Sequence, residues 1–410
     1  MHGSVEPYAG QRVMTNQGLK PNVLQLLGSF HQGGSERQAI QLTRLLRSND
    51  RYTIRLACLS AEGSLRKQVE DMGFPDVPAF PLTSFYDRNA VRQLRRFVKL
   101  LRSHAIDVVQ SHDFYTNVFG MAGAALAGVK VRIAARRETS GVRTKAQAKA
   151  ERLAYALAHV IVANADAVKT TLIDEGIAVR KIVTIHNGMD LSRIAVSPAA
   201  TRADLLSRLK LPAGYRFVTI VANLRHEVKD HGTFLRAARN VLNEVPDAAF
   251  VLAGEGELVK PMQDLTNELG LTRRTFFVGR CEHVNELLAV SDVCVLSSVA
   301  EGFSNSILEY MGAARPVVAT DVGGAREAIS ECVTGFVVPP RNPEAMSRRI
   351  IELLNDPDTA LAMGLAGRKV IEEKFSLAAQ LRDTEALYDR LLALRTVEAA
   401  GSQHVSSEIS

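Results

Sequence analysis

Short runs rich in Val, Ile and Leu alternate along the chain with longer segments whose apolar residues recur every three or four positions. Such short runs are typical of strands buried on both faces of a parallel sheet, and the longer segments are typical of the helices that cover it. The alternation occurs twice. The strands that it predicts span residues 21–27, 52–59, 106–112, 131–137, 160–164 and 182–188, then 216–223, 248–256, 275–280, 292–298, 316–321 and 335–340.

These elements predict an α/β protein made of two doubly wound, Rossmann-like domains that face each other across a cleft. The boundary between the two domains, called the seam below, falls at HNGMDLSRI, residues 186–194, where a strand ends in a turn and a polar stretch follows. After Phe375 only helical periodicity remains, and then a Ser- and Ala-rich end. The expected parts are a flexible segment 1–20, two domains over 21–193 and 194–375, a helix over 376–395 and a disordered tail over 396–410.

The composition is that of an ordinary globular protein, with 410 residues, 46% hydrophobic and 23% charged. The most apolar segment, residues 153–165, is too short to span a membrane, and the first twenty residues lack the apolar centre of a secretory signal. The four cysteines lie far apart and form no C-x-x-C pair, which predicts buried, reduced thiols. We therefore expect a cytoplasmic protein.

The positive charge is concentrated in the first half of the chain. Residues 1–190 hold 26 Lys and Arg against 16 Asp and Glu, whereas the remaining residues hold 24 against 28. Part of this excess lies in RQLRRFVKLLRSH, residues 92–104, which predicts an amphipathic helix with a basic face. That face is either simply solvated or contacts an anionic membrane or an acidic acceptor. Nucleic acid is not expected as a partner, because aromatic residues make up only 6% and do not alternate with the basic ones.

Ligands of doubly wound sheets bind beyond the carboxyl ends of the strands, so we look for chemistry in the loops that follow strands. The loop and helix at residues 297–324 offer the strongest case. Ser304 or Asn305 can cap a helix running to about residue 313, whose N-terminal N–H groups suit a phosphate, and Glu301 and Glu309 can bind sugar or ribose hydroxyls. The alternative is structural: Ser306 and Glu309 have capping-box spacing, and Glu301 could be a surface turn residue.

A second loop, NLRHEVKDHG at residues 223–232, places Arg225 and Lys229 after the first strand of the second domain. Two cations at this edge can hold a diphosphate, whose negative charge grows as its bond to a sugar breaks. The alternative is a pair of solvated loop cations, unless this loop and residues 297–324 meet at the same edge.

The first domain offers weaker signals. Gly33 and Gly34 follow the first strand and allow backbone N–H groups to approach an oxyanion, and His112 ends a strand where we expect it to point into the cleft. A structural role for His112 is the alternative. The sequence holds no dinucleotide fingerprint and no Walker A motif, and its only D-x-D, residues 356–358, lies in a turn between helices. We therefore expect no metal and no cofactor.

Together, the carboxylates of EGFSNSILE, the cations of residues 223–232, GGSE after the first strand and the HNGMD seam resemble the family-4 retaining glycosyltransferases of the GT-B fold. The resemblance covers about residues 21–393. It implies transfer of a sugar from a nucleotide sugar, without a metal, with the donor on the second domain, the acceptor on the first, and the final helix crossing back onto the first. It implies that Arg225 and Lys229 hold the pyrophosphate, Glu301 the hexose hydroxyls and Glu309 the ribose.

The same resemblance gives a full set of expected site residues. His112 would meet the sugar near its C6 end, so the expected catalytic residues are Arg225, Lys229, Glu301 and His112. The expected donor-binding residues are Gly33, Gly34, Gly302, Phe303, Ser304, Asn305 and Glu309, with Gly34 towards the acceptor side. Ser304 stands where family members often have a small residue next to a proline, which leaves the donor sugar open.

We therefore expect a retaining glycosyltransferase that moves a hexose from a nucleoside diphosphate sugar, with UDP as the expected nucleotide, to a glycan, lipid-linked or small-molecule hydroxyl. The basic first domain suggests peripheral contact with the inner face of the cell membrane. Two alternatives stay open at this point: a sugar-nucleotide 2-epimerase of similar fold, and a sugar-nucleotide-binding protein without activity.

Overall fold

The structure is a computed structural model that describes residues 20–139 and 143–407. The predicted flexible segment 1–20 therefore lies, except for Lys20, outside the described residues. All twelve predicted strands form. They are β1 (Asn22–Leu27), β2 (Thr53–Cys58), β3 (Val108–Ser111), β4 (Val131–Arg136), β5 (Val160–Ala163) and β6 (Ile182–Thr184), then β7 (Arg216–Val221), β8 (Ala248–Ala253), β9 (Thr275–Gly279), β10 (Ser291–Leu296), β11 (Val317–Thr320) and β12 (Gly335–Val338).

Helices connect the strands throughout. In the first half these are α1 (Gly34–Ser48), α2 (Arg66–Asp71), α3 (Arg88–Ser103), α4 (Phe114–Ala127), α5 (Lys145–Leu157), α6 (Asp166–Asp174) and the short 3-10 turns Val179–Lys181 and Leu191–Ile194. In the second half they are α7 (Arg202–Leu209), the turn Glu227–Lys229, α8 (His231–Glu244), α9 (Val259–Glu268), α10 (Val284–Val290), α11 (Asn305–Gly312), α12 (Ala325–Ala328), α13 (Pro343–Asn355), α14 (Pro357–Lys374) and α15 (Leu377–Ser407). Among these described residues, no helix is long and apolar enough to cross a bilayer.

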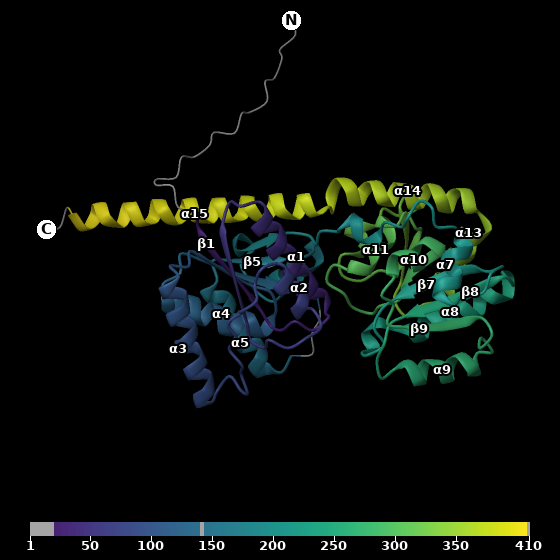
Figure 1. Cartoon of the computed structure of the whole chain (residues 1–410), viewed down its shortest axis with the longest axis horizontal. Helices are drawn as coiled ribbons and strands as arrows, with labels where there is room; N and C mark the ends of the chain where they lie inside the picture. Colours follow the sequence, from purple (N-terminus) through teal and green to yellow (C-terminus); the bar gives the residue numbers. More distant parts are fainter. Residues whose placement is uncertain (1–19, 140–142, 408–410) are drawn as a thin grey trace, which may run out of the picture.

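The strands form two six-stranded parallel sheets, one in each half of the molecule (Figure 1). Their orders are β2-β1-β3-β4-β5-β6 and β12-β11-β10-β7-β8-β9. The direction of winding reverses between β1 and β3 in the first sheet and between β7 and β10 in the second, which creates a crevice at the carboxyl ends of these strands.

Burial explains why the strands could be recognised as continuous apolar runs. Every residue of β5, β8 and β12 is buried, because helices cover both faces of each sheet. The expectation of four buried thiols holds for two of them. Cys58 and Cys294 are buried, but Cys281 is only partly buried and Cys332 is exposed in a turn with φ 62°.

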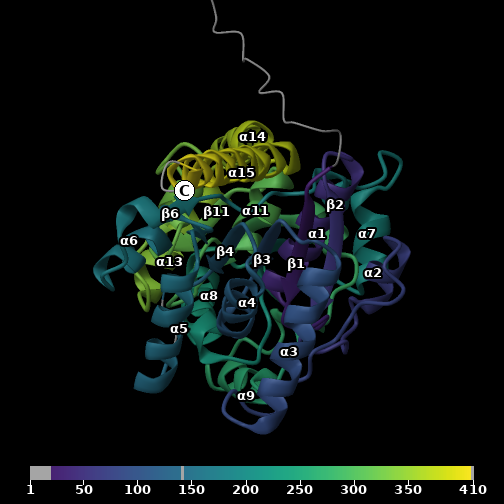
Figure 2. The ribbon, with the colours of Figure 1, turned by 90° about the vertical axis from the view of Figure 1, so that its left-hand side faces the viewer.

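The last two helices, α14 and α15, run along one side of both halves (Figures 1 and 2). α15 packs against the first sheet, where Leu387, Tyr388 and Leu391 complete an apolar cluster with β1, β3, β4 and β5. It is helical to Ser407, so the expected end at residue 395 is wrong, as is the disordered tail over 396–407. The continuation contains no proline, so no residue in it lacks the backbone N–H that a helix requires. Residues 408–410 lie outside the described residues.

Candidate functional site

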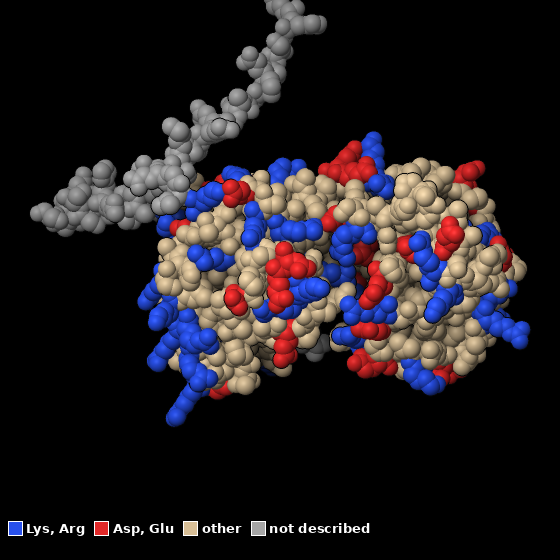
Figure 3. Space-filling model, in the orientation of Figure 1, with Lys and Arg blue, Asp and Glu red and all other residues tan. Residues whose placement is uncertain are grey.

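A cleft of about 1160 Å³ lies between the two halves, at the crevice formed by the strand ends. Figure 3 shows the molecule hollowed between its halves, with charged side chains of both signs along the edges of the hollow. Of the eleven expected site residues, all but His112 line this cleft; they are Gly33, Gly34, Arg225, Lys229, Glu301, Gly302, Phe303, Ser304, Asn305 and Glu309.

The two loops that carry the expected cations and carboxylates meet, as the functional interpretation requires. β7 and β10 are adjacent strands, and the backbone N–H of Val299 donates to the carbonyl of Val228 at 2.8 Å. The hydroxyl of Ser297 also donates to the Lys229 carbonyl, at 2.8 Å. The alternative of unrelated, solvated loop cations is therefore wrong for Lys229, whose backbone is fixed against the loop of the carboxylates.

Both cations already have an acidic partner. Lys229 Nζ lies 2.6 Å from Glu301 Oε1, which also accepts a hydrogen bond from the Ser298 hydroxyl. Arg225 lies 3.0 Å from a carboxylate oxygen of Glu255, but both of these side chains are about half exposed. Solvent weakens the Arg225 pair, so an incoming phosphate can take over that guanidinium more easily than the half-buried ammonium of Lys229.

The N-terminus of α11 opens into the cleft. Ser304 is the N-cap residue, but its side chain makes no capping hydrogen bond. Ser306 donates instead to the carbonyl of Val221 at the end of β7, at 2.8 Å, so the capping box proposed as an alternative for Ser306 and Glu309 does not form. The amides of the first turn therefore remain available to an anion, and the helix dipole adds to their attraction.

Glu309 lies one turn further into α11, at the inner wall of the cleft. Burial raises the pKa of its carboxyl above the usual value, while the guanidinium groups of Arg37 and Arg193 act in the opposite direction. The nearest cation is Arg37 of α1, whose guanidinium lies 3.8 Å from the carboxylate. A buried carboxylate with one distant ion pair is well suited to accept hydrogen bonds from a diol that enters the cleft.

Two glycines allow the halves to approach closely. A Cβ on Gly302 would lie 2.0 Å from the carbonyl oxygen of Arg137 in the first half, a distance that no side chain tolerates. A Cβ on Gly34 would lie 3.2 Å from the amide nitrogen of Asn305. Gly302 therefore needs a residue without a side chain, whereas a side chain at Gly34 would require the Asn305 amide to move by a few tenths of an ångström.

His112 does not point into the cleft, contrary to the expectation. It is buried behind Arg137, which can only donate a hydrogen bond, so Nδ1 accepts from the guanidinium at 3.3 Å and Nε2 donates to Gln25 Oε1 at 2.7 Å. Burial, aided by the charge of Arg137, holds the pKa of His112 well below its usual value and keeps the ring neutral. The prediction that His112 lies at a strand end is confirmed. The sequence could not show its hydrogen-bond partners, because Gln25 and Arg137 belong to distant parts of the chain.

The sequence interpretation missed a set of amide and guanidinium groups that joins the halves. Asn305 Oδ1 accepts from Asn187 at 3.0 Å and from Gln38 at 3.1 Å. Arg137 donates to Asn187 Oδ1 at 2.9 Å. A signal existed for two of them, because Asn187 belongs to the HNGMD seam and Arg137 follows a strand directly.

No arrangement of three or more His, Cys, Asp or Glu suited to a metal occurs in the part of the chain that the structure describes. The only D-x-D lies between α13 and α14, where Asp356 caps α14 by accepting from the Thr359 N–H at 3.0 Å. Metal independence itself stays a prediction.

These features suit the binding of an anionic, hydroxyl-bearing ligand between two Rossmann-like halves. The family model "Glycosyltransferase Family 4" matches residues 32–193, and "Glycosyl transferases group 1" matches residues 202–370. The chain belongs to this family of group 1, family-4 glycosyltransferases, which confirms the resemblance read from its motifs.

Individual relatives agree with this assignment. The chain is 31% identical to EpsD of Bacillus subtilis over 194 residues, which is 47% of this chain and 51% of that protein, so the match spans about half of EpsD. It is 25% identical to the UDP-Gal:alpha-D-GlcNAc-diphosphoundecaprenol alpha-1,3-galactosyltransferase of Escherichia coli over 342 residues, which is 79% of this chain and 85% of that enzyme.

Among solved structures, HepE of Anabaena in complex with UDP matches with a TM-score of 0.80 and 21% identity. The match covers 91% of this chain and 100% of HepE. The fold is thus the two-domain GT-B arrangement, which agrees with the two Rossmann-like domains that the pattern predicted and with the fold that the family resemblance implied.

Proposed function

We propose that this glycosyltransferase moves a hexose from a UDP-sugar to a hydroxyl group, with retention of anomeric configuration and without a metal. The observation that carries the proposal is the meeting of the Lys229 loop, Glu301 and the N-terminus of α11 at one wall of the cleft. A diphosphate bound there would contact a cation and the N–H groups of a helix. These groups stabilise the negative charge that develops on the leaving nucleoside diphosphate in the transition state more than they stabilise the intact nucleotide sugar. UDP in the HepE complex and in the name of the Escherichia coli relative supports this nucleotide.

The roles of the remaining groups follow from their positions. Glu309 would accept hydrogen bonds from the ribose, and Glu301 would bind hexose hydroxyls while holding Lys229. His112 would act behind Arg137, because it does not line the cleft. Gly302 to Asn305 would contact sugar and phosphate through the backbone, and the first half would hold the acceptor near Gly34.

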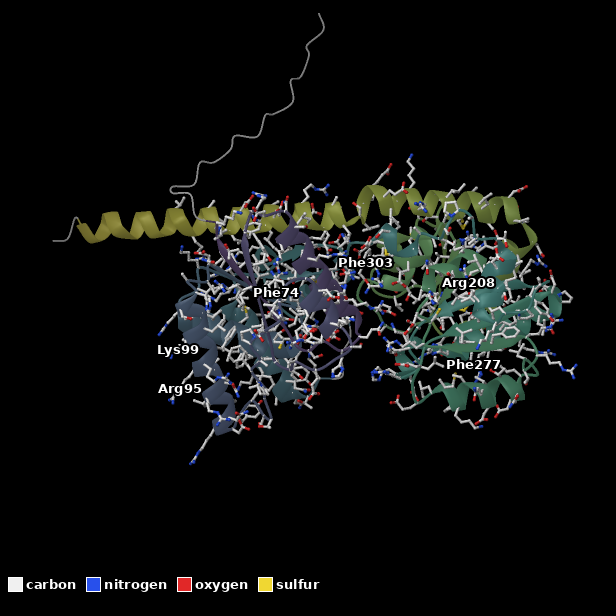
Figure 4. The ribbon with its side chains drawn as sticks, in the orientation of Figure 1. Phe74, Arg95, Lys99, Arg208, Phe277 and Phe303 are labelled. Carbon is white, nitrogen blue, oxygen red and sulfur yellow. The ribbon has the colours of Figure 1, made fainter. Side chains whose placement is uncertain are left out.

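We further propose that the acceptor is a glycan or a lipid-linked sugar and that α3 contacts an anionic membrane. Figure 4 shows Arg95 and Lys99 projecting outward from α3, and Figure 3 shows basic side chains gathered over the same region. A groove of about 800 Å³ beside them has an apolar floor that includes Val91 and Leu126, both at least half exposed. Basic side chains above exposed apolar ones suit a lipid headgroup region, and the lipid-linked acceptor named for the Escherichia coli relative supports the idea.

A panel of UDP- and GDP-sugars, followed for release of the nucleoside diphosphate, tests the proposal. Slow hydrolysis of one donor, faster with an acceptor and resistant to excess EDTA, is the expected outcome. Conversion of the sugar with the diphosphate intact would instead indicate a 2-epimerase, and binding without turnover a binding protein. Loss of activity in EDTA with rescue by Mg²⁺ would overturn the metal-independent mechanism.

A further inference from the structure

The first sheet carries two buried amides on the face that α15 covers. Gln25 in β1 and Gln110 in β3 are direct register partners, with 0% and 3% exposure. Side chains alternate along a strand, so Leu24 and Leu26 point to the opposite face and join a different apolar cluster from Val23. A buried amide destabilises the fold unless its donors and acceptors are satisfied, so two of them on this face require polar partners.

Tyr388 of α15 is a partner of both amides. Its hydroxyl accepts from Gln25 Nε2 at 2.9 Å and donates to Gln110 Oε1. The side chain is fully buried, and burial raises the pKa of the hydroxyl well above its usual value, so the hydroxyl keeps the proton that it donates. The last helix of the chain therefore bonds to both strands between which the winding of the first sheet reverses.

The hydrogen bonds continue from Gln25 to the wall of the cleft. Gln25 Oε1 accepts from His112 Nε2 at 2.7 Å, and His112 Nδ1 accepts from Arg137 at 3.3 Å. Arg137 lines the cleft, where its guanidinium also donates to Asn187 Oδ1 at 2.9 Å. Its Nε is buried and has no partner in the part of the chain that the structure describes. The guanidinium is therefore held by two neutral acceptors among these residues, and one of the two is His112.

Only one arrangement of protons satisfies this network, which consists of Arg137, His112, Gln25, Tyr388 and Gln110. A guanidinium cannot accept, so His112 Nδ1 must hold the lone pair and Nε2 the proton. Nε2 then needs an acceptor, so the Gln25 amide turns its oxygen to the histidine and its NH₂ group to α15. Because that NH₂ group can only donate, the tyrosine hydroxyl accepts from it and gives its own proton to Gln110.

We propose that Tyr388 is a positioning residue for the reaction: through Gln25 and His112, its hydroxyl keeps Arg137 directed at the cleft. Without this hydroxyl, the Gln25 NH₂ group loses its acceptor on the α15 side and the amide can turn over. The amide then offers a donor to His112 Nε2, which moves the ring proton to Nδ1, where it faces the guanidinium. Arg137 is left with Asn187 as its acceptor and loses its fixed orientation. The kinetic part of this proposal rests on the proposed function, whereas the ring tautomer is measured without turnover.

Tyr388→Phe removes only the hydroxyl, and Tyr52→Phe is the matched control. The Tyr52 ring packs edge to face on Tyr388 at 5.5 Å, and its hydroxyl donates to Asp389 of α15 at 3.0 Å. The control thus removes a hydrogen bond to α15 that lies outside the network. Nitrogen NMR on protein labelled at the histidine rings reports the tautomer, with His112→Asn to assign the signal. We expect the parent and Tyr52→Phe to carry the proton on Nε2, and Tyr388→Phe to gain the form with the proton on Nδ1.

Steady-state kinetics with a UDP-sugar measures the consequence for the reaction. The kcat of Tyr388→Phe should fall roughly tenfold. The affinity for UDP should stay parental, because the proposed donor loops belong to the second half, and Tyr52→Phe should keep the parental kcat. Gln25→Leu interrupts the same network, so adding Tyr388→Phe to it should lower kcat no further.

A parental His112 that is protonated on Nδ1, or on both nitrogens at neutral pH, would overturn the proposal. An unchanged tautomer in Tyr388→Phe, or a change of the same size in Tyr52→Phe, would overturn it as well. So would additive losses of kcat in the double variant, or an altered tautomer with a parental kcat. If the parent hydrolyses no donor, the proposed function fails instead, and the tautomers of the parent and of the two tyrosine variants still decide whether Tyr388 acts on His112.

Discussion

At the scale of single residues, the cleft holds charges that are restrained by neighbours of opposite sign rather than left free. Lys229 is drawn to Glu301, and Arg225 to Glu255. A bound diphosphate competes with these carboxylates for the two cations. What each cation adds to diphosphate binding is therefore its attraction to the diphosphate minus the attraction to its carboxylate partner that is given up. The half-buried Lys229 is screened less than the exposed Arg225, and it should therefore contribute more.

Replacing Lys229 with Ala should lower turnover of the donor by about 10²-fold or more, because the substitution removes a preorganised positive group. Replacing Arg225 with Ala should lower it by somewhat less. Steady-state kinetics on the preferred donor measures this. Arg208→Ala is the matched control, because Arg208 also pairs with a carboxylate, Glu286, on the second half but does not line the cleft. Near-parental turnover in both cleft variants would mean that these cations do not hold the phosphates.

Glu309→Gln separates binding from structure, because no capping box forms and the amide is nearly isosteric. If Glu309 accepts from a ribose diol, the variant loses charge-assisted hydrogen bonds worth about 1.5 to 3 kcal/mol, and donor affinity should fall tenfold or more. Calorimetric titration with UDP measures the change. Equal affinity in parent and variant would rule out the ribose contact.

The same variant has a predictable pH dependence of stability. Since the folded-state pKa of Glu309 lies above its usual value, the folded chain binds a proton that the unfolded chain has already released. The Glu309 carboxyl therefore lowers the free energy of unfolding of the parent as the pH rises from 4.5 to the raised pKa of the folded state. The Glu309→Gln variant has no carboxyl at this position and does not lose stability in this way. Thermal unfolding should show the variant gaining on the parent as the pH rises above 4.5, the ordinary pKa of the carboxyl group. A constant difference in melting temperature would contradict the raised pKa.

At the scale of elements, the sequence was sufficient for the strands and insufficient for contacts between them. A buried parallel strand is visible as a local apolar run, and the loops of Arg225 and Glu301 could be assigned to one edge because adjacent strands end together. The partners of His112 could not be found in this way, because Gln25 is 87 residues away and Arg137 belongs to another strand end. The capping box that the sequence allowed as an alternative fails for a related reason: Ser306 and Glu309 have the right spacing, but the distant Val221 carbonyl accepts from the Ser306 hydroxyl.

The basic helix α3 gives a prediction at this scale. Vesicles containing anionic lipid should co-sediment the protein at low salt and release it at high salt, because each basic residue near the surface contributes about 1 kcal/mol over a Debye length of about 8 Å. Changing Arg92, Arg95, Arg96 and Lys99 together to Gln should remove most of the binding and leave donor hydrolysis intact. A quadruple variant that sediments like the parent would identify α3 as a merely solvated helix.

At the scale of the whole molecule, the two halves are joined by specific hydrogen bonds across the cleft. Besides the amides around Asn305, the Thr139 hydroxyl donates to the Glu301 carbonyl at 2.7 Å. On the outer side, the Glu327 carboxylate accepts from the backbone N–H groups of Asp166 and Ala167 at 2.8 and 2.9 Å, and so caps α6 from the opposite half. These contacts hold the halves at the spacing in which side chains of both line the cleft.

Asn187→Ala should lower kcat about tenfold or more and change donor KM little. Asn187 joins the halves, whereas the donor loops belong to the second half alone, and the change leaves Arg137 without one of its acceptors at a cost of about 1 to 3 kcal/mol. Steady-state kinetics resolves the two parameters. Asn49→Ala is the control, since Asn49 also links α1 to the C-terminal helix, through Glu385, but outside the cleft. A rise in donor KM with unchanged kcat would assign Asn187 to binding instead.

The return of α15 to the first sheet also affects how the protein is made. Tyr388 is fully buried against Tyr52 and hydrogen-bonds Gln25 and Gln110, all of which leave the ribosome more than 270 residues earlier. While the second half is being synthesised, the face of the first sheet that Leu387, Tyr388 and Leu391 will cover stays open to water. The first half therefore cannot complete its folding in the order of translation, and the nascent chain carries an exposed, aggregation-prone apolar surface until the last helix is released.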